Sequence, residues 1–214
     1  MRKLLLIFFL LNTLFVRSQT KAITDEGRQV ILMEDGTWKY DNDSNEVKLE
    51  NDTIKLNPNG FYKAKGETFL LKSKNVNIGI YLNPSKWIFK PHRENETTPE
   101  YRFESKSGDA YAMLITEKTE IDLENLRSLA LQNAQSAAAD TRIVQQEYRI
   151  VNGEKLLYLQ MRGTVKGIKF VYEGYYFSDD SGTTQFVSYS DQKQFNKVRP
   201  ELQEFLNGFV RIKR

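Results

Sequence analysis

The sequence predicts an α+β fold built on an antiparallel sheet, and three observations predict it. Only tight turns separate four strand-like runs, at 142–151, 155–163, 168–178 and 183–190. Strands joined by hairpins pair antiparallel. Residues 121–139 repeat apolar side chains at spacings of three and four, the pattern of an amphipathic helix. Residues 192–207 show the same pattern near the C-terminus.

Each predicted helix carries signals at its ends. Asp122 stands where its carboxylate can cap the free amides of the first helix. Gly208 suits the end of the second helix. Pro200 lies inside the second helix, so we expect a kink there or two short helices.

Three more strands are expected before the first helix. Residues 76–82 alternate apolar and other side chains, which predicts a half-buried strand. Two further strands, 101–104 and 110–117, flank a turn at 106–109. A polar loop is expected over 90–100.

The N-terminus has the composition of a secretory signal. Arg2 and Lys3 precede an apolar run that ends at Val16, which is shorter than the roughly 20 residues that a bilayer core requires. We expect residues 1–18 to be removed by cleavage between Ser18 and Gln19. The mature protein is then exported to the periplasm or the extracellular medium, with no stable membrane anchor after cleavage; an uncleaved anchor is the alternative.

Cysteine and charge limit the classes of partner. The chain has no cysteine, which excludes a lipoprotein anchor and disulfides. Three of its 31 Lys and Arg residues lie in the leader, and the remaining 28 equal the 28 Asp and Glu residues. Because phosphate backbones are bound by clustered cations, we expect no nucleic-acid partner.

The mature chain is expected to have three parts. Residues 19–40 alternate short strand-like runs with Asp-Gly and Glu-Gly turns, which predicts three tiny strands in a short β-hairpin segment. Residues 41–60 are polar and rich in Asn, which indicates a linker. Residues 61–214 form the main α+β domain.

The order of these elements resembles the PsbP-like fold, as found in small exported bacterial proteins of unassigned function. The residues that carry the likeness are Asn83-Pro84 leading to Trp87, the strand 111–116 before Asp122, the turn 151–153, the aromatic strand 172–177 and the segment 205–209. The resemblance spans about 76–210. It implies an α/β/α sandwich with helices on both faces of the sheet, and a binding or assembly role.

The usual catalytic and metal motifs are absent from the sequence. The only histidine, His92, stands in the polar loop, where we expect an exposed side chain. Zinc would need several Cys or His ligands. The segment Asp179-Asp180-Ser181 could offer oxygen ligands to calcium, but without the repeating loop motif a plain hairpin turn is favoured. No phosphate-binding glycine motif occurs, so we expect no cofactor.

Carboxylates supply the alternative function, a hydrolase acting on a cell-wall or polysaccharide substrate. Such an enzyme needs two carboxyl groups about 5 to 10 Å apart in a cleft. The candidates are Glu117, Glu120, Asp122, Glu124, Asp179, Asp180 and Asp191. Asp122 and Glu124 are also expected to serve the positive end of the first helix.

The leading hypothesis is an exported, non-enzymatic binding or assembly accessory whose partner is a protein or a cell-envelope component. Trp38 and Tyr40 are the predicted partner surface. On the strand 168–178, Tyr172 and Tyr176 should face one side and Tyr175 and Phe177 the other. These rings are core if helices cover both faces and a binding surface if one face is bare. A flat structural or inhibitory protein is a third possibility.

Deleting residues 19–45 is expected to leave the main domain folded and to weaken capture of its partner. Circular dichroism and thermal unfolding of the truncated chain measure the first effect, and affinity capture measures the second. Loss of cooperative unfolding in the truncated chain would instead place the N-terminal segment within the core.

Overall fold

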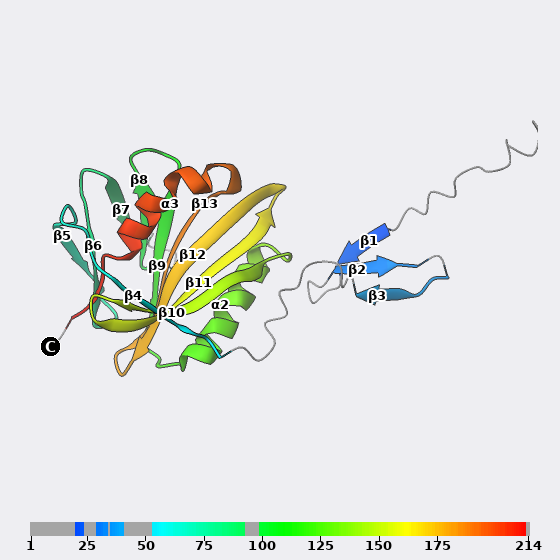
Figure 1. Cartoon of the computed structure of the whole chain (residues 1–214), viewed down its shortest axis with the longest axis horizontal. Coiled ribbons are helices and arrows are strands. Elements are labelled where there is room, and N and C mark those ends of the chain that lie inside the picture. Colours follow the sequence, from blue (N-terminus) through cyan, green and yellow to red (C-terminus); the bar gives the residue numbers. More distant parts are fainter. Residues whose placement is uncertain (1–19, 24–28, 34, 41–52, 93–98, 213–214) are drawn as a thin grey trace, which may run out of the picture. The chain divides into compact units, whose positions relative to one another are not determined.

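The computed structural model describes residues 20–23, 29–33, 35–40, 53–92 and 99–212 (Figure 1). The chain divides into two compact units, 1–46 and 47–214, and each is described by itself. The predicted leader and its cleavage point at Ser18 and Gln19 lie outside the described residues. Among the described residues, no helix has the length and apolar character needed to cross a bilayer.

The N-terminal unit contains a small antiparallel sheet of three strands in the order β1-β2-β3, which confirms the three predicted strands. Its strands are β1 (Thr20–Ile23), β2 (Gln29–Leu32) and β3 (Trp38–Tyr40). The β2–β3 turn is held by Asp35, whose carboxylate accepts hydrogen bonds from the Thr37 amide at 2.9 Å and the Thr37 hydroxyl at 2.6 Å. Gly36 supplies the positive φ of 80° that this turn requires.

The main unit is built on an eight-stranded sheet in the order β4-β10-β11-β12-β13-β9-β8-β7. Its strands are β4 (Leu56–Phe61), β7 (Trp87–Pro91), β8 (Tyr101–Ser105), β9 (Tyr111–Glu117), β10 (Arg142–Val151), β11 (Glu154–Val165), β12 (Ile168–Asp179) and β13 (Gly182–Asp191). Every neighbouring pair is antiparallel except β4 and β10. The predicted four-strand meander is therefore confirmed.

Two tight turns set the register of this meander. Asn152 and Gly153 both have positive φ, at 49° and 90°, and so do Lys166 and Gly167, at 49° and 81°. Two central residues with positive φ define the type I′ turn, whose twist matches that of paired strands. In the hairpins β10–β11 and β11–β12, the strands are therefore paired right up to a two-residue turn.

Strand β4 corrects the predicted linker. Residues 41–60 were expected to be a linker that buries little. Leu56–Phe61 instead forms a parallel strand beside β10, although four of its six residues are exposed, and residues 41–52 lie outside the described part of the chain. The Tyr148 amide donates to the Lys55 carbonyl at 2.8 Å, and the Lys63 amide donates to the Asn152 side chain at 3.0 Å. An edge strand tolerates Pro58 because one side of its backbone needs no ladder partner.

A second, three-stranded sheet lies on one side of the large one, in the order β14-β6-β5. Its strands are β5 (Phe69–Lys72), β6 (Ile78–Leu82) and β14 (Phe209–Arg211). Only β6 was predicted. Its buried residues Ile78, Ile80 and Leu82 belong to the same apolar cluster as the last helix.

Two helices lie on opposite sides of the large sheet, as Figure 1 shows. Helix α2 (Leu123–Ala137) begins at Asp122, whose side chain accepts hydrogen bonds from the amides of Glu124 and Asn125, as predicted. Helix α3 (Gln192–Leu206) is one continuous helix, so the two short helices considered from Pro200 are not found. Pro200 and Asn196 are both exposed, so water can reach the carbonyl group that proline leaves unpaired.

The larger core lies between α3, the large sheet and the small sheet, with Phe205 at its centre. The Phe205 ring stacks on Trp87 with centroids 4.1 Å apart. It also meets Phe103 edge-on at 5.0 Å and Phe186 at 5.1 Å. These contacts hold α3 against β7, β8 and β13, and the smaller core lies under α2.

Phe205→Ala is expected to lower the free energy of unfolding by about 3 to 5 kcal/mol, because truncation leaves a cavity among three rings. Urea unfolding followed by fluorescence measures the loss. The control is Phe69→Ala, at a ring that is 42% exposed, for which a clearly smaller loss is expected. Equal losses for the two variants would contradict this view of the core.

Candidate functional site

Helix α2 leaves part of its side of the sheet uncovered. It packs mainly on β10, β11 and β12, where Leu157, Leu159 and Met161 are fully buried. On the same side of the remaining strands, side chains of β9, β8 and β7 keep contact with solvent, and so does Tyr189 of β13, whereas Val187 of β13 belongs to the buried cluster under α2. Ile88 is 43% exposed, and Tyr111 and Tyr189 are half-buried. We call this part of the sheet the open face.

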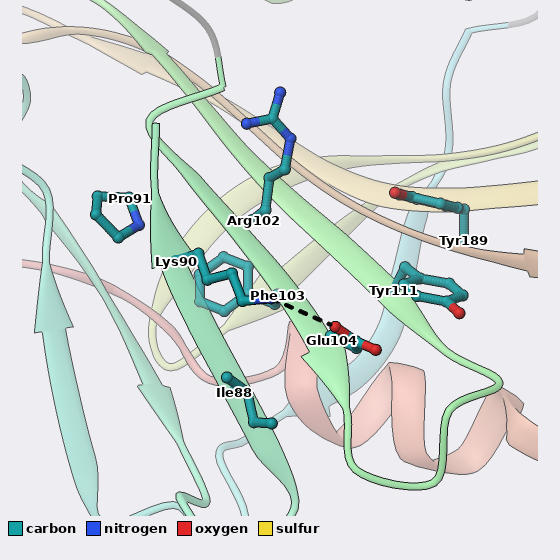
Figure 2. Close-up of a pocket in the computed structure, with 8 residues that line it drawn as sticks. All are labelled: Ile88, Lys90, Pro91, Arg102, Phe103, Glu104, Tyr111 and Tyr189. Carbon is teal, nitrogen blue, oxygen red and sulfur yellow. Dashed lines mark ion pairs between the residues drawn. The ribbon is translucent and has the colours of Figure 1, made fainter. Parts of the chain in front are cut away.

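The open face holds a pocket of about 410 Å³, a size at which small ligands or single side chains are bound. Figure 2 shows the side chains around it. They are Ile88, Lys90, Pro91, Arg102, Phe103, Glu104, Tyr111 and Tyr189, from β7, β8, β9 and β13. Two cations, one carboxylate, two tyrosines and Ile88 therefore lie close together on the open face, whereas the Phe103 ring is 2% exposed and packs in the core under α3.

Strand register lines up the aromatic side chains of the open face. Tyr111 of β9 is directly paired with Tyr189 of β13, and Tyr189 is directly paired with Tyr172 of β12. The Tyr111 and Tyr189 rings stack with centroids 5.7 Å apart, and the Tyr189 and Tyr172 rings are 5.8 Å apart. These three side chains form what we call the tyrosine row. Burial is the main cause that raises the pKa of the Tyr189 hydroxyl, and the neighbouring Tyr172 raises it further. The hydroxyl therefore stays neutral and can donate a hydrogen bond.

The tyrosine row continues toward the edge of the sheet through Glu104 and Ile88, which are paired with each other. Beside them Lys90 of β7 is paired directly with Arg102 of β8, and we call these two residues the basic pair. Like charges opposite one another destabilise a pair of strands. The Lys90 ammonium and the Glu104 carboxylate are 4.0 Å apart, as the dashed line in Figure 2 marks.

The aromatic strand was predicted correctly in its parity. Tyr172 and Tyr176 lie on the α2 side, and Tyr175 and Phe177 lie in the α3 core. Tyr176, Tyr175 and Phe177 are buried, while Tyr172 joins the open face. Neither Tyr111 nor Tyr189 was singled out from the sequence, because their meeting depends on the pairing of β9 with β13, and α2 and three strands lie between these two strands in the chain.

The predicted partner surface belongs to the N-terminal unit. Trp38 is 53% exposed, and its cross-strand neighbour Leu32 is 43% exposed. Tyr40 is paired through its backbone with Val30. Both residues belong to the unit 1–46, and they stay a predicted partner surface.

The candidate carboxylates do not line the pocket, where Glu104 is the only acidic residue among the described residues. Asp122 and Asp191 cap α2 and α3. The Asp179 carboxylate accepts a hydrogen bond from the Ser181 amide at 2.9 Å and lies 2.9 Å from the Arg211 guanidinium of β14. The Asp179–Ser181 segment is therefore a hairpin turn that forms an ion pair with β14. Within the part of the chain that the structure describes, no three acidic or histidine side chains could hold a metal ion. His92 is exposed beyond the end of β7.

A buried polar cluster under α3 is the other concentration of charge. The Arg149 guanidinium lies 3.5 Å from the centre of the Tyr158 ring and pairs with Glu147 at 2.6 Å. The Tyr158 hydroxyl donates to Glu173 at 2.7 Å, and burial raises the pKa of that carboxyl. Because Arg199 of α3 approaches the same carboxylate at 3.5 Å, this cluster fixes the helix and has no open side for a ligand.

Glu67 also has a perturbed carboxyl group, which is a common sign of catalysis. Burial, the largest cause, raises its pKa to about 8, and its side chain is 1% exposed. One carboxylate oxygen accepts a hydrogen bond from the Ala64 amide at 3.1 Å. This hydrogen bond closes the loop between β4 and β5, and Glu67 does not line the pocket of the open face.

No family model and no curated protein matches this sequence. Among solved structures it is similar to the cyanobacterial PsbP protein, CyanoP, of Synechocystis, with a TM-score of 0.50, 10% identity and coverage of 69% of this chain and 94% of that one. It is also similar to the Ran-binding protein Mog1p of Saccharomyces cerevisiae (TM-score 0.45, 10% identity, 68% and 95%). LpqN of Mycobacterium tuberculosis gives a TM-score of 0.43, 10% identity and coverage of 68% and 90%. At these identities the likeness shows the fold alone, and the PsbP-like fold is confirmed.

Glu67→Gln is expected to change how stability depends on pH. Between the usual pKa of 4.5 and the folded value of about 8, the folded state keeps a proton that the unfolded state has released, so wild-type stability falls as pH rises. The glutamine variant lacks this penalty and should gain stability relative to wild type from pH 4.5 to 8. Urea unfolding across this range measures it, with Glu120→Gln, an exposed carboxylate, as the control for loss of one charge. Parallel curves for wild type and Glu67→Gln would refute the assignment.

Proposed function

We propose that this protein is an exported, non-enzymatic binding or assembly accessory that holds a partner protein on its open face. The observation that carries the proposal is the tyrosine row beside a preformed pocket. Export rests on the leader over residues 1–18, and the final location is the periplasm or the medium. Trp38 and Tyr40 are a second proposed contact.

The chemistry of the open face is that of a protein-binding surface. Tyrosine and arginine are enriched among the residues that dominate interface energies. Tyrosine offers a large contact area with only two side-chain torsions to fix. Tyr111 and Tyr189 already stack against each other in the free chain, so little further ordering is needed when a partner binds.

A partner is expected to engage side chains rather than to add a strand to β7. The Trp87 amide at the start of this edge strand donates to the Asn83 carbonyl at 2.9 Å. Pro91 at its other end has no amide hydrogen, and proline on an edge blocks pairing with another strand. The side chains of Ile88 and Lys90 remain exposed beside the pocket.

The hydrolase alternative has no comparable support. A glycoside hydrolase needs two carboxyl groups facing one bond, and among the residues that the structure describes the pocket is lined by one, Glu104. The Glu104 carboxylate lies next to Lys90 in an exposed ion pair. The same groups serve well to orient a bound ligand.

Site-specific photo-crosslinking tests the proposed function. A photoreactive residue placed at Ile88, which is 43% exposed on the open face, is expected to crosslink to a discrete exported protein. The matched control is Ile168, which is 48% exposed at the first residue of β12. The crosslink should be competed by unmodified protein and reduced by Tyr189→Ser.

Equal crosslinking from Ile88 and Ile168, or a crosslink that Tyr189→Ser leaves unchanged, would remove the open face as the binding surface. Thermal unfolding of Tyr189→Ser shows whether the variant is folded. Because Tyr189 is half-buried, a folded variant with a lost crosslink separates binding from stability.

A further inference from the structure

We propose that the hairpin between β11 and β12 docks on an anionic lipid surface, with Ile168 entering the headgroup layer and the surrounding cations meeting lipid phosphates. We call residues 165–169 the hairpin tip, and Arg142 and Arg162 lie at its base. The inference goes beyond the proposed function, because none of these residues lines the pocket of the open face. It commits to a lipid surface, and an acidic polysaccharide or a protein occupant is an opposing outcome of the test.

The hairpin tip extends past the strands on either side of it (Figure 1). Strand β11 has its last β10 partner at Arg162, and β12 has its first β13 partner at Phe170. Within the described sheet, residues 163–169 therefore have ladder partners only in each other. The base of this ribbon is braced, because the Asp140 carboxylate accepts a hydrogen bond from the Thr164 amide at 2.7 Å. The tip is thus a preformed projection from the sheet.

Cations are concentrated around this projection. Arg142 and Arg162 are directly paired on neighbouring strands, and both are exposed. Lys169 lies on the same side of the sheet as Arg162, since its partner Thr164 is two residues further along β11. Lys166 is exposed in the turn. In the described part of the chain, none of these four cations forms an ion pair.

The carboxylates of Asp140 and Asp191 lie at the same end of the sheet, and both have other roles. Asp140 accepts the hydrogen bond that braces the hairpin. Asp191 caps α3 by accepting a hydrogen bond from the Lys193 amide at 2.6 Å. Four cations against two carboxylates leave an excess of positive charge here, although outside residues 1–18 the chain has 28 Lys and Arg against 28 Asp and Glu. Attraction to an anionic surface is therefore a property of the hairpin and not of the whole chain.

Ile168 is the apolar residue among these cations, and it is 48% exposed at the first residue of β12. A single exposed isoleucine is ordinary in a soluble protein. Its place is what matters here, because it stands next to Lys169 and close to Lys166 at the end of a projecting ribbon. Neighbouring residues of a strand face opposite sides, so the ribbon is apolar on the side of Ile168 and basic on the side of Lys169.

A lipid surface is the occupant that uses both kinds of side chain. Interfacial segments bury apolar residues at the level of the headgroups while their cations attract anionic lipids. The long side chains of Lys166 and Lys169 can reach phosphates while Ile168 leaves water. An acidic polysaccharide would engage the cations and leave Ile168 exposed. With one apolar side chain and four cations, docking is expected to be reversible.

Vesicle sedimentation with the full mature chain tests the inference. Binding is expected to vesicles that contain phosphatidylcholine and phosphatidylglycerol in equal amounts, and not to vesicles of phosphatidylcholine alone. Added salt should weaken this binding, because ions screen the attraction between exposed charges. Equal binding to both kinds of vesicle, or binding to neither, overturns the inference. Binding of an acidic polysaccharide or of a discrete protein through the same lysines, with no vesicle bound, also overturns it.

Charge variants test the placement of the cations. Lys169→Gln should weaken partitioning onto the mixed vesicles about 5-fold, which is the contribution of one cation near an anionic surface. The matched control is Lys118→Gln, at an exposed lysine that follows β9. The end of β9 pairs with Thr183, at the opposite end of β13 from the hairpin, so this variant should bind like wild type. Equal losses in the two variants would show that only net charge matters and would contradict the placement.

Ile168→Ser tests insertion without a change of charge. It should weaken partitioning about 10-fold, because the isoleucine side chain no longer leaves water on docking. Leu56→Ser, at a leucine that is 53% exposed on β4, is the control and should bind like wild type. Thermal unfolding checks that each variant is folded. Unchanged binding in folded Ile168→Ser would refute insertion.

Crosslinking keeps this inference apart from the proposed function. A photoreactive residue at Ile168 is expected to label lipid when mixed vesicles are present, whereas the one at Ile88 captures a protein. Absence of lipid labelling with an intact Ile88 crosslink removes the lipid docking of the hairpin alone.

Discussion

The main unit depends on a mismatch in width between its sheet and the helices that cover it. Eight strands at ~4.8 Å spacing make a sheet about 34 Å wide, whereas a helix with its side chains is about 10 Å across. On one face α3 and the small sheet β14-β6-β5 together close the core. On the other face α2 packs alone, mainly over β10, β11 and β12. The open face is therefore a consequence of topology, since nothing in the described part of the chain is positioned to cover the remaining strands.

Side-chain choice follows this division along the strands. Where α2 covers the sheet, β11 presents Leu157, Leu159 and Met161. One strand further on, Tyr172 marks the border, and beyond it the row continues with Tyr189 and Tyr111. Tyrosine suits a half-buried position because its ring packs against neighbours while its hydroxyl reaches water. The change from aliphatic to tyrosine side chains therefore traces the limit of the helix, and the basic pair lies at the far edge, where solvent can hydrate its charges.

Local sequence patterns predicted the elements whose partners are adjacent in the chain. The meander β10 to β13, the start of α2 at Asp122 and the amphipathic face of α3 depend on turns, caps and periodicity, which are local properties. Strands β4, β5, β7 and β14 were missed because they are short, and some of them pair with distant segments, as Leu56 does with Tyr148. The pocket was missed for the same reason, since Tyr111 and Tyr189 become neighbours only when β9 pairs with β13. Trp38 and Tyr40 were singled out because they looked exposed, which a local sequence pattern can indicate. A site assembled from four strands cannot be predicted without knowing the order of those strands in the sheet.

Alternate residues of β12 have different roles, because their side chains face opposite sides of the sheet. Glu173 points to the α3 side, where it accepts a hydrogen bond from Tyr158 and meets Arg199, and Tyr175 donates to Asn207 at the end of α3 at 2.7 Å. One residue earlier, Tyr172 points to the α2 side and joins the tyrosine row. Buried charges are costly to leave unpaired, so the polar groups on the α3 side are committed to holding that helix in place. On the open face, Lys90 and Glu104 form an ion pair whose side chains are 72% and 48% exposed, so water already solvates both charges. A partner can replace that water at small cost, which is why we place the proposed binding role on the α2 side although the more strongly perturbed carboxyl groups lie elsewhere.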